Sequence, residues 1–171
     1  AGVCDSEKTP ADGILSMANS LRHRGPDDQG FMALQGTHFI PMAGPLTVPE
    51  CAALKPIDKA LPASLFLAHQ RLSILDVSAS GHQPMISASG RYAIVHNGEV
   101  YNYQEIRAEL NHSGITFRSK SDTEVILAAY EQWGPSCVER FIGMWAFAII
   151  DREKHEIFLS RDRFGIKPLY V

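Results

Sequence analysis

Apolar residues recur along the chain at two spacings, one typical of helices and one typical of strands. Ile14, Ala18 and Leu21 keep the helical spacing, which predicts a helix that ends near residues 24–26. Residues 1–5, which precede it, are typical of a short strand that breaks into a polar loop. The chain is therefore expected to open with a strand and a helix.

The following stretch predicts strands separated by one long loop. Residues 30–40 indicate a β-hairpin with its turn at Gln35-Gly36, and residues 65–75 indicate a further strand. Between them, residues 41–63 hold five prolines. Such a segment predicts an inserted surface loop, with a helical turn near residues 51–54.

From residue 90 onward, strands and helices follow one another in pairs. Residues 92–96 are predicted to form a strand. Asn102 with Glu105 resembles the capping box of a following helix, in which Ile106 and Leu110 recur at helical spacing. Ser121-Asp122-Thr123-Glu124 indicates a second capping box. The other predicted elements are helices that reach His112 and Trp133, a short helix at 135–140, and a hairpin of strands 144–151 and 155–161. Because strands come in runs with helices between pairs of strands, the pattern favours an α+β fold in a single domain, residues 1–171.

Composition and charge narrow the functional classes. The 171 residues carry a net charge of -3 without a run of Lys or Arg, so no nucleic-acid partner is expected. Residues 144–150 are too few to span a bilayer, and no charged-then-apolar leader opens the chain, so we expect no membrane partner and a cytoplasmic location. Cys4, Cys51 and Cys137 are odd in number and widely spaced, which fits a reducing compartment better than a disulfide framework.

The seven histidines show no metal-ligand spacing. His38, His69 and His155 lie in strand-like segments, where a structural role is the favoured interpretation. We therefore expect no metal site.

The polar step Asn97-Gly98-Glu99 separates the predicted strand at 92–96 from the helix that starts at Asn102. An Asn-Gly pair between two apolar runs normally predicts a hairpin turn. Here a helix follows, so the strand is expected to end at the side-chain amide of Asn97 and the backbone N–H of Gly98. Two such donors side by side are what an oxyanion hole needs. A plain turn is the alternative.

Two other polar groups stand out: Arg71, which closes the apolar run 65–70 within the strand-like segment, and Asp122, in the first turn of the helix that the second capping box opens. Singly, each has a plain explanation: a surface arginine, and an acid that complements a helix dipole. Together, a guanidinium that binds a carboxylate, an acid that binds an ammonium group and two oxyanion donors suit a free α-amino acid whose side-chain carbonyl is attacked. That description fits glutamine.

Six motifs occur in the order found in the N-terminal glutaminase domain of glutamine-dependent asparagine synthetases, which this chain therefore resembles. They are residues 21–30, 71–76, 81–85, 97–102, 121–124 and 160–170. The resemblance covers nearly the whole chain apart from the loop at 41–63. It implies a class II glutamine amidotransferase with the N-terminal-nucleophile hydrolase fold, an αββα sandwich of two mainly antiparallel sheets.

The resemblance also implies a role for each matching residue. The implied substrate-binding residues are Arg71, Leu72, Ile74, Asn97, Gly98, Glu99 and Asp122. Arg71 would bind the α-carboxylate of glutamine, with backbone groups of Leu72 and Ile74 beside it. The two acids, Glu99 and Asp122, would hold the α-ammonium group. The remaining two residues of the set would form the oxyanion hole.

In this family an N-terminal cysteine attacks the glutamine amide, and its own free amine activates the thiol. Family members begin Cys-Gly-Ile-Ala-Gly, whereas this chain begins Ala1-Gly2-Val3. We therefore expect that the nucleophilic cysteine is missing and that the chain as printed has little glutaminase activity. Cys4 is a poor substitute, because Asp5-Ser6 follow it and because it lies too near Arg24 for the usual spacing.

We predict the amidotransferase domain of an asparagine synthetase-like enzyme, which hydrolyses glutamine to glutamate and ammonia for an ATP-dependent synthetase domain in cis or in trans. No nucleotide-binding loop of the Ser-Gly-Gly-x-Asp type follows, so the synthetase domain is expected to be absent from this chain. ATP and Mg are expected only in that domain, and no cofactor is expected in this one.

Two alternatives stay open. One is a non-catalytic pseudo-amidotransferase module that senses glutamine or docks onto a synthetase. The other is an N-terminal-nucleophile hydrolase of another amide, which the pairing of Arg71 with Asp122 disfavours. The sequence does not decide whether the chain forms a homodimer, which acceptor receives the ammonia, or what the loop at 41–63 does.

Overall fold

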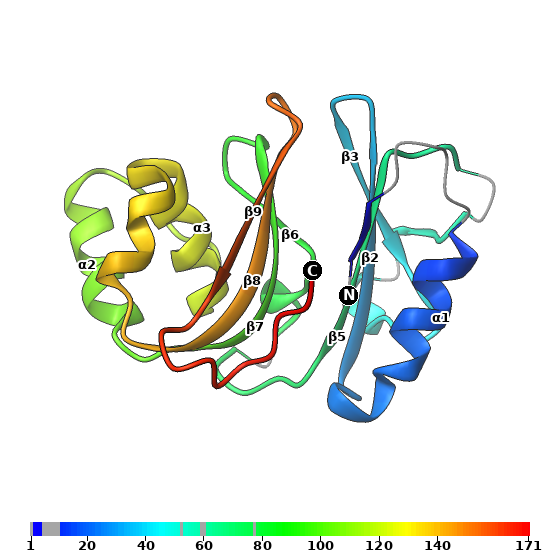
Figure 1. The fold of residues 1–171 in the computed structure, drawn as a ribbon, viewed down its shortest axis with the longest axis horizontal. Coiled ribbons are helices and arrows are strands. Elements are labelled where there is room, and N and C mark those ends of the chain that lie inside the picture. The colour runs from blue at the N-terminus through cyan, green and yellow to red at the C-terminus, as the bar shows by residue number, and fades with distance from the viewer. Residues whose placement is uncertain (1, 5–10, 52, 59–60, 77) are drawn as a thin grey trace. The chain divides into compact units, whose positions relative to one another are not determined.

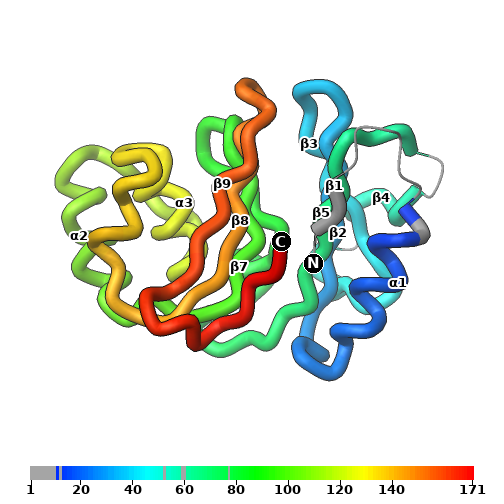
Figure 2. The backbone as a smooth tube through the Cα atoms, viewed as in Figure 1, coloured from blue at the N-terminus to red at the C-terminus, as the bar shows by residue number. Residues whose placement is uncertain are grey.

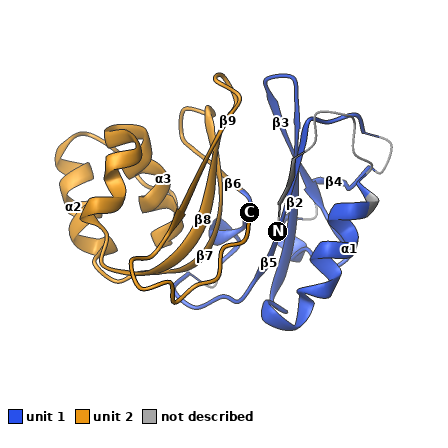
Figure 3. Cartoon of the chain, viewed as in Figure 1, with its two compact units in different colours: residues 1–84 blue, residues 85–171 orange. Residues whose placement is uncertain are grey.

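The chain divides into two compact units, Ala1–Pro84 and Met85–Val171, and each is described by itself (Figure 3). The structure is a computed structural model. It describes residues 2–4, 11–51, 53–58, 61–76 and 78–171.

The first unit is a five-stranded sheet with one helix on it (Figure 1). Its elements are β1 (Gly2–Cys4), α1 (Asp12–Ser20), β2 (Asp28–Gln35), β3 (His38–Ala43), β4 (Lys55–Pro56) and β5 (Leu65–Arg71). The strand order is β1-β5-β2-β3-β4, antiparallel except for the short parallel pair of β3 with β4. The predicted opening strand, first helix and hairpin are all confirmed.

The core of the first unit lies between α1 and the sheet. Ile14 and Ala18 are four residues apart, so they share one face of the helix, and both are buried. They pack in one apolar cluster with Phe31 of β2 and Phe66 of β5. The helical spacing seen in the sequence is thus the spacing of the buried face.

The second unit is a four-stranded sheet with two helices over one face (Figure 1). Its elements are β6 (Met85–Ile86), β7 (Tyr92–Val100), α2 (Tyr103–His112), α3 (Asp122–Trp133), β8 (Gly143–Asp151) and β9 (Glu156–Arg161). The strands run antiparallel in the order β6-β7-β8-β9, and Figure 2 shows β8 returning as β9 through a tight hairpin. Both units are therefore built on mainly antiparallel sheets, as the sequence predicts.

Alternate residues of β8 build the core of the second unit. Trp145, Phe147 and Ile149 are buried, and they share an apolar cluster with Leu110 of α2 and Ile126 of α3.

None of the helices among the described residues is both long and apolar enough to cross a membrane.

Two predicted strand ends are wrong, and the length of the partner strand explains both. β5 ends at Arg71 instead of residue 75, because β2, its partner, begins at Asp28 directly opposite Arg71. β7 continues past His96 to Val100, because β8 extends alongside it as far as Gly143. A strand lasts as long as a neighbour satisfies its backbone groups, which local sequence does not reveal.

The segment at 41–63 is more ordered than an inserted loop. β3 extends into it as far as Ala43, β4 lies within it, and its helical turn is a 3₁₀ turn at Pro49–Cys51 instead of 51–54. The hydroxyl of Thr47 donates to the carbonyl of Gln29 at 2.5 Å. The segment is therefore fastened to the start of β2.

Only one of the two predicted capping motifs caps its helix. The hydroxyl of Ser121 accepts the N–H of Thr123 at 3.0 Å, whereas the Glu124 carboxylate turns away to the N–H of Ser119 at 2.7 Å. Asn102 makes no side-chain cap for α2. Its amide instead bonds the carbonyl of Arg140 and the N–H of Ile142, both at 2.9 Å, because these groups lie beside the helix start.

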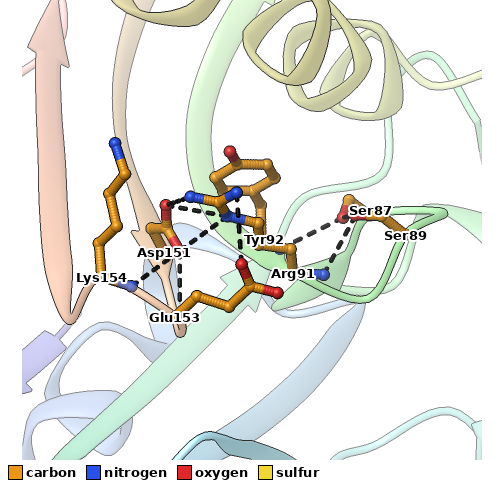
Figure 4. Close-up of polar contacts among 7 residues, drawn as sticks. All are labelled: Ser87, Ser89, Arg91, Tyr92, Asp151, Glu153 and Lys154. Atoms are coloured by element: carbon orange, nitrogen blue, oxygen red, sulfur yellow. Dashed lines mark hydrogen bonds and ion pairs between the residues drawn. The ribbon is translucent and has the colours of Figure 1, made fainter.

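An ion pair joins the turn end of the β8–β9 hairpin to Arg91, the residue before β7 (Figure 4). The guanidinium of Arg91 donates to both carboxylate oxygens of Asp151, with distances of 2.6–3.1 Å. The same carboxylate accepts the N–H groups of Glu153 and Lys154 in the turn. His155, predicted in a strand, lies in this turn with φ of +56°.

We predict that Asp151→Asn lowers the melting temperature by several degrees at pH 7. The hydrogen bond from Arg91 lowers the pKa of Asp151, although burial opposes the shift. A lowered folded-state pKa contributes stability above the unfolded-state value, near pH 4, and this stability is lost as the pH falls through the folded-state pKa. The gap between wild type and variant should therefore close below about pH 4. A gap that persists unchanged at pH 3 would contradict this assignment.

Candidate functional site

The three residues predicted as a strand end, Asn97, Gly98 and Glu99, lie inside β7. They stand opposite Ala146, Trp145 and Met144 of β8. Asn97 is exposed and Glu99 is half-buried. The polar step is thus a stretch of paired strand, which holds its backbone in a fixed position.

Gly98 is the residue that lets the two strands run this close. Its φ is +152°, and a Cβ at this position would collide with the carbonyl oxygen of Met144 and the Cα of Trp145. The glycine is therefore required by close backbone approach within a sheet. The Asn-Gly pair signals this approach and not a turn.

Asp122, the first residue of α3, is tied to the end of the same strand. Its carboxylate accepts the N–H of Val100 at 2.9 Å, and the residue is only 5% exposed. This bond holds the carboxylate one residue beyond Glu99. The structure thus brings Asn97, Gly98, Glu99 and Asp122 together around the end of β7.

A second contact between β7 and α3 is made by His96, which precedes Asn97, and Thr123, which follows Asp122. Neither residue was assigned a role from the sequence. Their Nδ1 and Oγ1 atoms are 3.1 Å apart, and both residues are buried. Burial lowers the pKa of His96, with a small opposing effect of Asp122, so the imidazole is neutral near pH 7. A histidine in an otherwise apolar strand was the signal available in the sequence.

Arg71 is the last residue of β5, in the first unit, and is 8% exposed. Its guanidinium donates to the carbonyl of Ser78 at 2.9 Å and to the carbonyl of Asp76. Leu72 and Ile74, predicted beside it, follow the strand and are mostly exposed. These three residues belong to the first unit, and the four around β7 belong to the second.

Comparison with known proteins identifies the family. The glutamine amidotransferase domain family matches residues 59–171, about two thirds of the chain. The chain belongs to this family. The predicted resemblance is thereby confirmed.

Curated relatives of this amidotransferase domain include asparagine synthetases. The chain is 36% identical over 171 residues to the putative asparagine synthetase [glutamine-hydrolyzing] 2 of Methanocaldococcus jannaschii, covering 92% of this chain and 28% of the relative. It is 38% identical over 157 residues to asparagine synthetase B [glutamine-hydrolyzing] of Escherichia coli, covering 92% of this chain and 23% of the relative. The chain thus spans about a quarter of the length of these relatives.

A solved structure shows the same fold. The glutamine phosphoribosylpyrophosphate amidotransferase of B. subtilis, in complex with ADP and GMP, matches 98% of this chain and 38% of its own with a TM-score of 0.78. At 23% sequence identity the likeness concerns the fold alone. It confirms the predicted N-terminal-nucleophile hydrolase fold with two mainly antiparallel sheets.

The last motif of this amidotransferase domain, residues 160–170, is organised by Asp162. Its carboxylate accepts the N–H groups of Trp145, Phe164, Ile166 and Lys167 at 2.9–3.3 Å. Burial alone would raise the pKa of Asp162, but these four donors together lower it. The motif therefore fastens the segment after β9 to Trp145, the residue opposite Gly98.

Neither described cysteine side chain suits a nucleophile. Burial raises the pKa of Cys137 to about 12, and burial also raises that of Cys51. Reactive thiols have lowered pKa values, so both are poor thiolates at neutral pH. The predictions on Ala1 and on the side chain of Cys4 lie outside the described residues. Within the described ranges, no three His, Cys, Asp or Glu side chains are arranged to hold a metal ion.

We predict that Gly98→Ala destabilises the protein by about 2–4 kcal/mol, since it adds both an unfavourable φ and a backbone collision. Gly114→Ala is the matched control, because Gly114 also has a positive φ, +88°, but no atom within 4 Å of a built Cβ. The control should lose only about 1 kcal/mol. Urea unfolding measures both, and equal losses would rule out the close approach as the cause.

Proposed function

We propose that the chain binds L-glutamine and, with the family's N-terminal cysteine ahead of it, hydrolyses glutamine to glutamate and ammonia for a synthetase portion of an asparagine synthetase-like enzyme. The observation that carries this proposal is Arg71, a nearly buried guanidinium held by two backbone carbonyls at the end of β5. ATP and Mg would act only in the synthetase portion.

Arg71 suits the α-carboxylate of glutamine. A guanidinium carries five N–H donors in a rigid fork, and two of its N–H groups donate to the carbonyls of Asp76 and Ser78. These bonds fix the orientation of the fork and leave further donors for a ligand. A preorganised guanidinium binds a carboxylate through paired, charge-assisted hydrogen bonds. Backbone groups of Leu72 and Ile74 would lie beside that carboxylate.

The residues around the end of β7 suit the rest of the ligand. Asp122 and Glu99 would hold the α-ammonium group. Both are acids, and the Asp122 carboxylate bonds the N–H of Val100, the residue after Glu99 in β7. The side-chain amide of Asn97 and the N–H of Gly98 would stabilise the oxyanion, and the rigid pairing of β7 with β8 keeps these donors oriented before reaction.

The chemistry is a two-step acyl transfer. A cysteine thiolate adds to the amide carbonyl carbon of the glutamine side chain, and the carbonyl electrons move onto oxygen. The tetrahedral species collapses as the C–N bond breaks, the nitrogen takes up a proton, and ammonia leaves. Water then cleaves the thioester, which releases glutamate and restores the thiol.

The register of β1 supports the position of that cysteine. Gly2 stands opposite Leu67, and each step toward the N-terminus moves one residue along β5 toward Arg71. In the family's opening, Cys-Gly-Ile-Ala-Gly, the cysteine stands four residues before the glycine that matches Gly2. Four further steps along β5 end at Arg71. Extended pairing would thus bring the nucleophile beside the group that holds the substrate carboxylate.

We predict that isothermal calorimetry detects L-glutamine binding to this chain and that Arg71→Ala weakens it by at least about 100-fold, because charge-assisted bonds are lost. Asp122→Asn should weaken it by about 10-fold or more. Glu139→Gln, an exposed change on the 3₁₀ turn Gly134–Arg140, is the control and should leave affinity unchanged. Undetectable binding by the unmodified chain, or equal binding by all variants, would favour a docking module.

We also predict that the chain as printed turns over little glutamine and that adding Cys-Gly-Ile ahead of Ala1, with the cysteine as first residue, produces glutaminase activity. The matched control begins Ser-Gly-Ile, which keeps the backbone and removes the thiol. Ammonia release measures both. Turnover by the printed chain that disappears on Cys4→Ala would overturn the assignment of the nucleophile.

A further inference from the structure

The guanidinium of Arg71 lies in a cradle formed by residues 76 and 78–82. The carbonyls of Asp76 and Ser78 accept its two bonds. Gly81 lies against Nη2, the nitrogen that bonds the Asp76 carbonyl, since a Cβ there would collide with Nη2 and Cζ of Arg71. The described contacts between the cradle and the guanidinium are therefore with backbone atoms, and they set the direction of its fork.

His82, the last residue of the cradle, connects it to the neighbouring strand. Its Nδ1 is 2.7 Å from Oδ2 of Asp28, the first residue of β2. Asp28 is 1% exposed and stands directly opposite Arg71 in the sheet. The contact joins residues 54 positions apart, which makes it a tertiary link and not a local turn.

Asp28 is a firm anchor for this link. Its other oxygen, Oδ1, accepts the N–H of Gln29 at 2.8 Å and the N–H of Val48 at 3.1 Å. Burial alone would raise the pKa of Asp28, but the hydrogen bond and charge of His82 and these two N–H groups lower it. The carboxylate is thus ionised and held from both sides.

These contacts close a ring. Arg71 and Asp28 are paired across β5 and β2, Arg71 donates to the cradle, and the cradle returns to Asp28 through His82. Most other hydrogen bonds of the cradle are local, such as those from Ser78 to the side chain of Asp76. Loss of the His82 contact would remove this hydrogen-bonded link between β2 and the end of the cradle next to Gly81.

We propose that His82 is a positioning residue for glutamine binding: through Asp28 it holds the cradle in the form that aims the free N–H groups of Arg71 at the substrate α-carboxylate. The inference rests on the proposed function. A purely structural latch would stabilise the unit without favouring any chemical group of the ligand. A variant of His82 should therefore weaken the binding of the α-carboxylate specifically if His82 is a positioning residue. It should affect ligands with and without that group equally if His82 is only structural.

The test compares L-glutamine with L-glutaminamide, which has a neutral amide in place of the α-carboxylate, by calorimetry on the 171-residue chain. His82→Leu removes the hydrogen bond to Asp28, whereas His82→Asn keeps a donor near the position of Nδ1. All measurements are made below the lowest melting temperature of the set. Asp28→Asn is a second variant of the same link if His82→Leu does not fold.

We expect His82→Leu to reduce the preference for glutamine over its α-amide by about tenfold, in the same direction as Arg71→Ala, because the directed charge-assisted bonds to the carboxylate weaken. His82→Asn should keep the preference within about twofold. Asp151→Asn, which loosens an ion pair in the other unit, should lower the melting temperature and leave the preference unchanged.

The outcomes separate the two proposals. If Arg71→Ala reduces the preference and His82→Leu weakens both ligands equally or neither, His82 is only structural and this inference is overturned. If the wild-type chain shows no preference and Arg71→Ala changes nothing, the glutamine-binding role of Arg71 fails, and the role of His82 fails with it.

Discussion

The close pairing of β7 with β8 at Gly98 is the constraint on which the candidate site of the second unit depends. Because Gly98 has no Cβ, β7 can run on beside the backbone of Met144 and Trp145 instead of ending at Asn97. The extended strand then presents the Val100 N–H to Asp122. The position of the Asp122 carboxylate, bonded to the N–H of Val100, therefore depends on the absence of a Cβ at Gly98.

The same strand pair organises residues that take no part in the proposed chemistry. Trp145, opposite Gly98, donates its backbone N–H to Asp162, whose carboxylate also gathers the N–H groups of the following turn. His96, one residue before Asn97, contacts Thr123 of α3. The carboxylate of Asp162 and the imidazole of His96, both buried, thus each take part in hydrogen bonding, which offsets the cost of burying polar groups.

In the first unit, the buried charge of Arg71 is stabilised by hydrogen bonds. Its charge is met by backbone carbonyls, and no carboxylate binds the guanidinium in the described contacts. Such an arrangement keeps the cation orientated without neutralising it, which suits a group that must bind an anionic ligand. The neighbouring carboxylate, Asp28, is instead occupied by His82 and by backbone N–H groups.

Periodicity in the sequence was sufficient for the helices and most strands, because Ile14 with Ala18, and Ile106 with Leu110, repeat at the spacing of a buried face. The end of β7 was mispredicted because Asn-Gly is typical of turns, whereas the length of β8 decides where β7 stops. The predictions of the C-terminal end of β5 and of the cap of α2 failed for the same reason, since both depend on partners distant in sequence.

The candidate residues were found from chemistry and family resemblance, but the contacts that hold these residues in place were not. The contact of His82 with Asp28 spans 54 residues, and that of Asp122 with Val100 spans 22, so neither leaves a local pattern. The segment at 41–63 was likewise predicted as a plain loop, because its bonds to Asp28 and Gln29 are tertiary. Motifs indicate the candidate groups, whereas tertiary contacts determine how those groups are held.

The central claim is that Arg71 binds the α-carboxylate of glutamine. The most direct test of this claim is the structure of a crystal of the chain that has been soaked with L-glutamine. The account predicts the α-carboxylate within about 3 Å of the guanidinium nitrogens of Arg71, with the bonds from Arg71 to Asp76 and Ser78 retained. Glutamine bound elsewhere, or with its carboxylate away from an otherwise unchanged Arg71, would contradict the account.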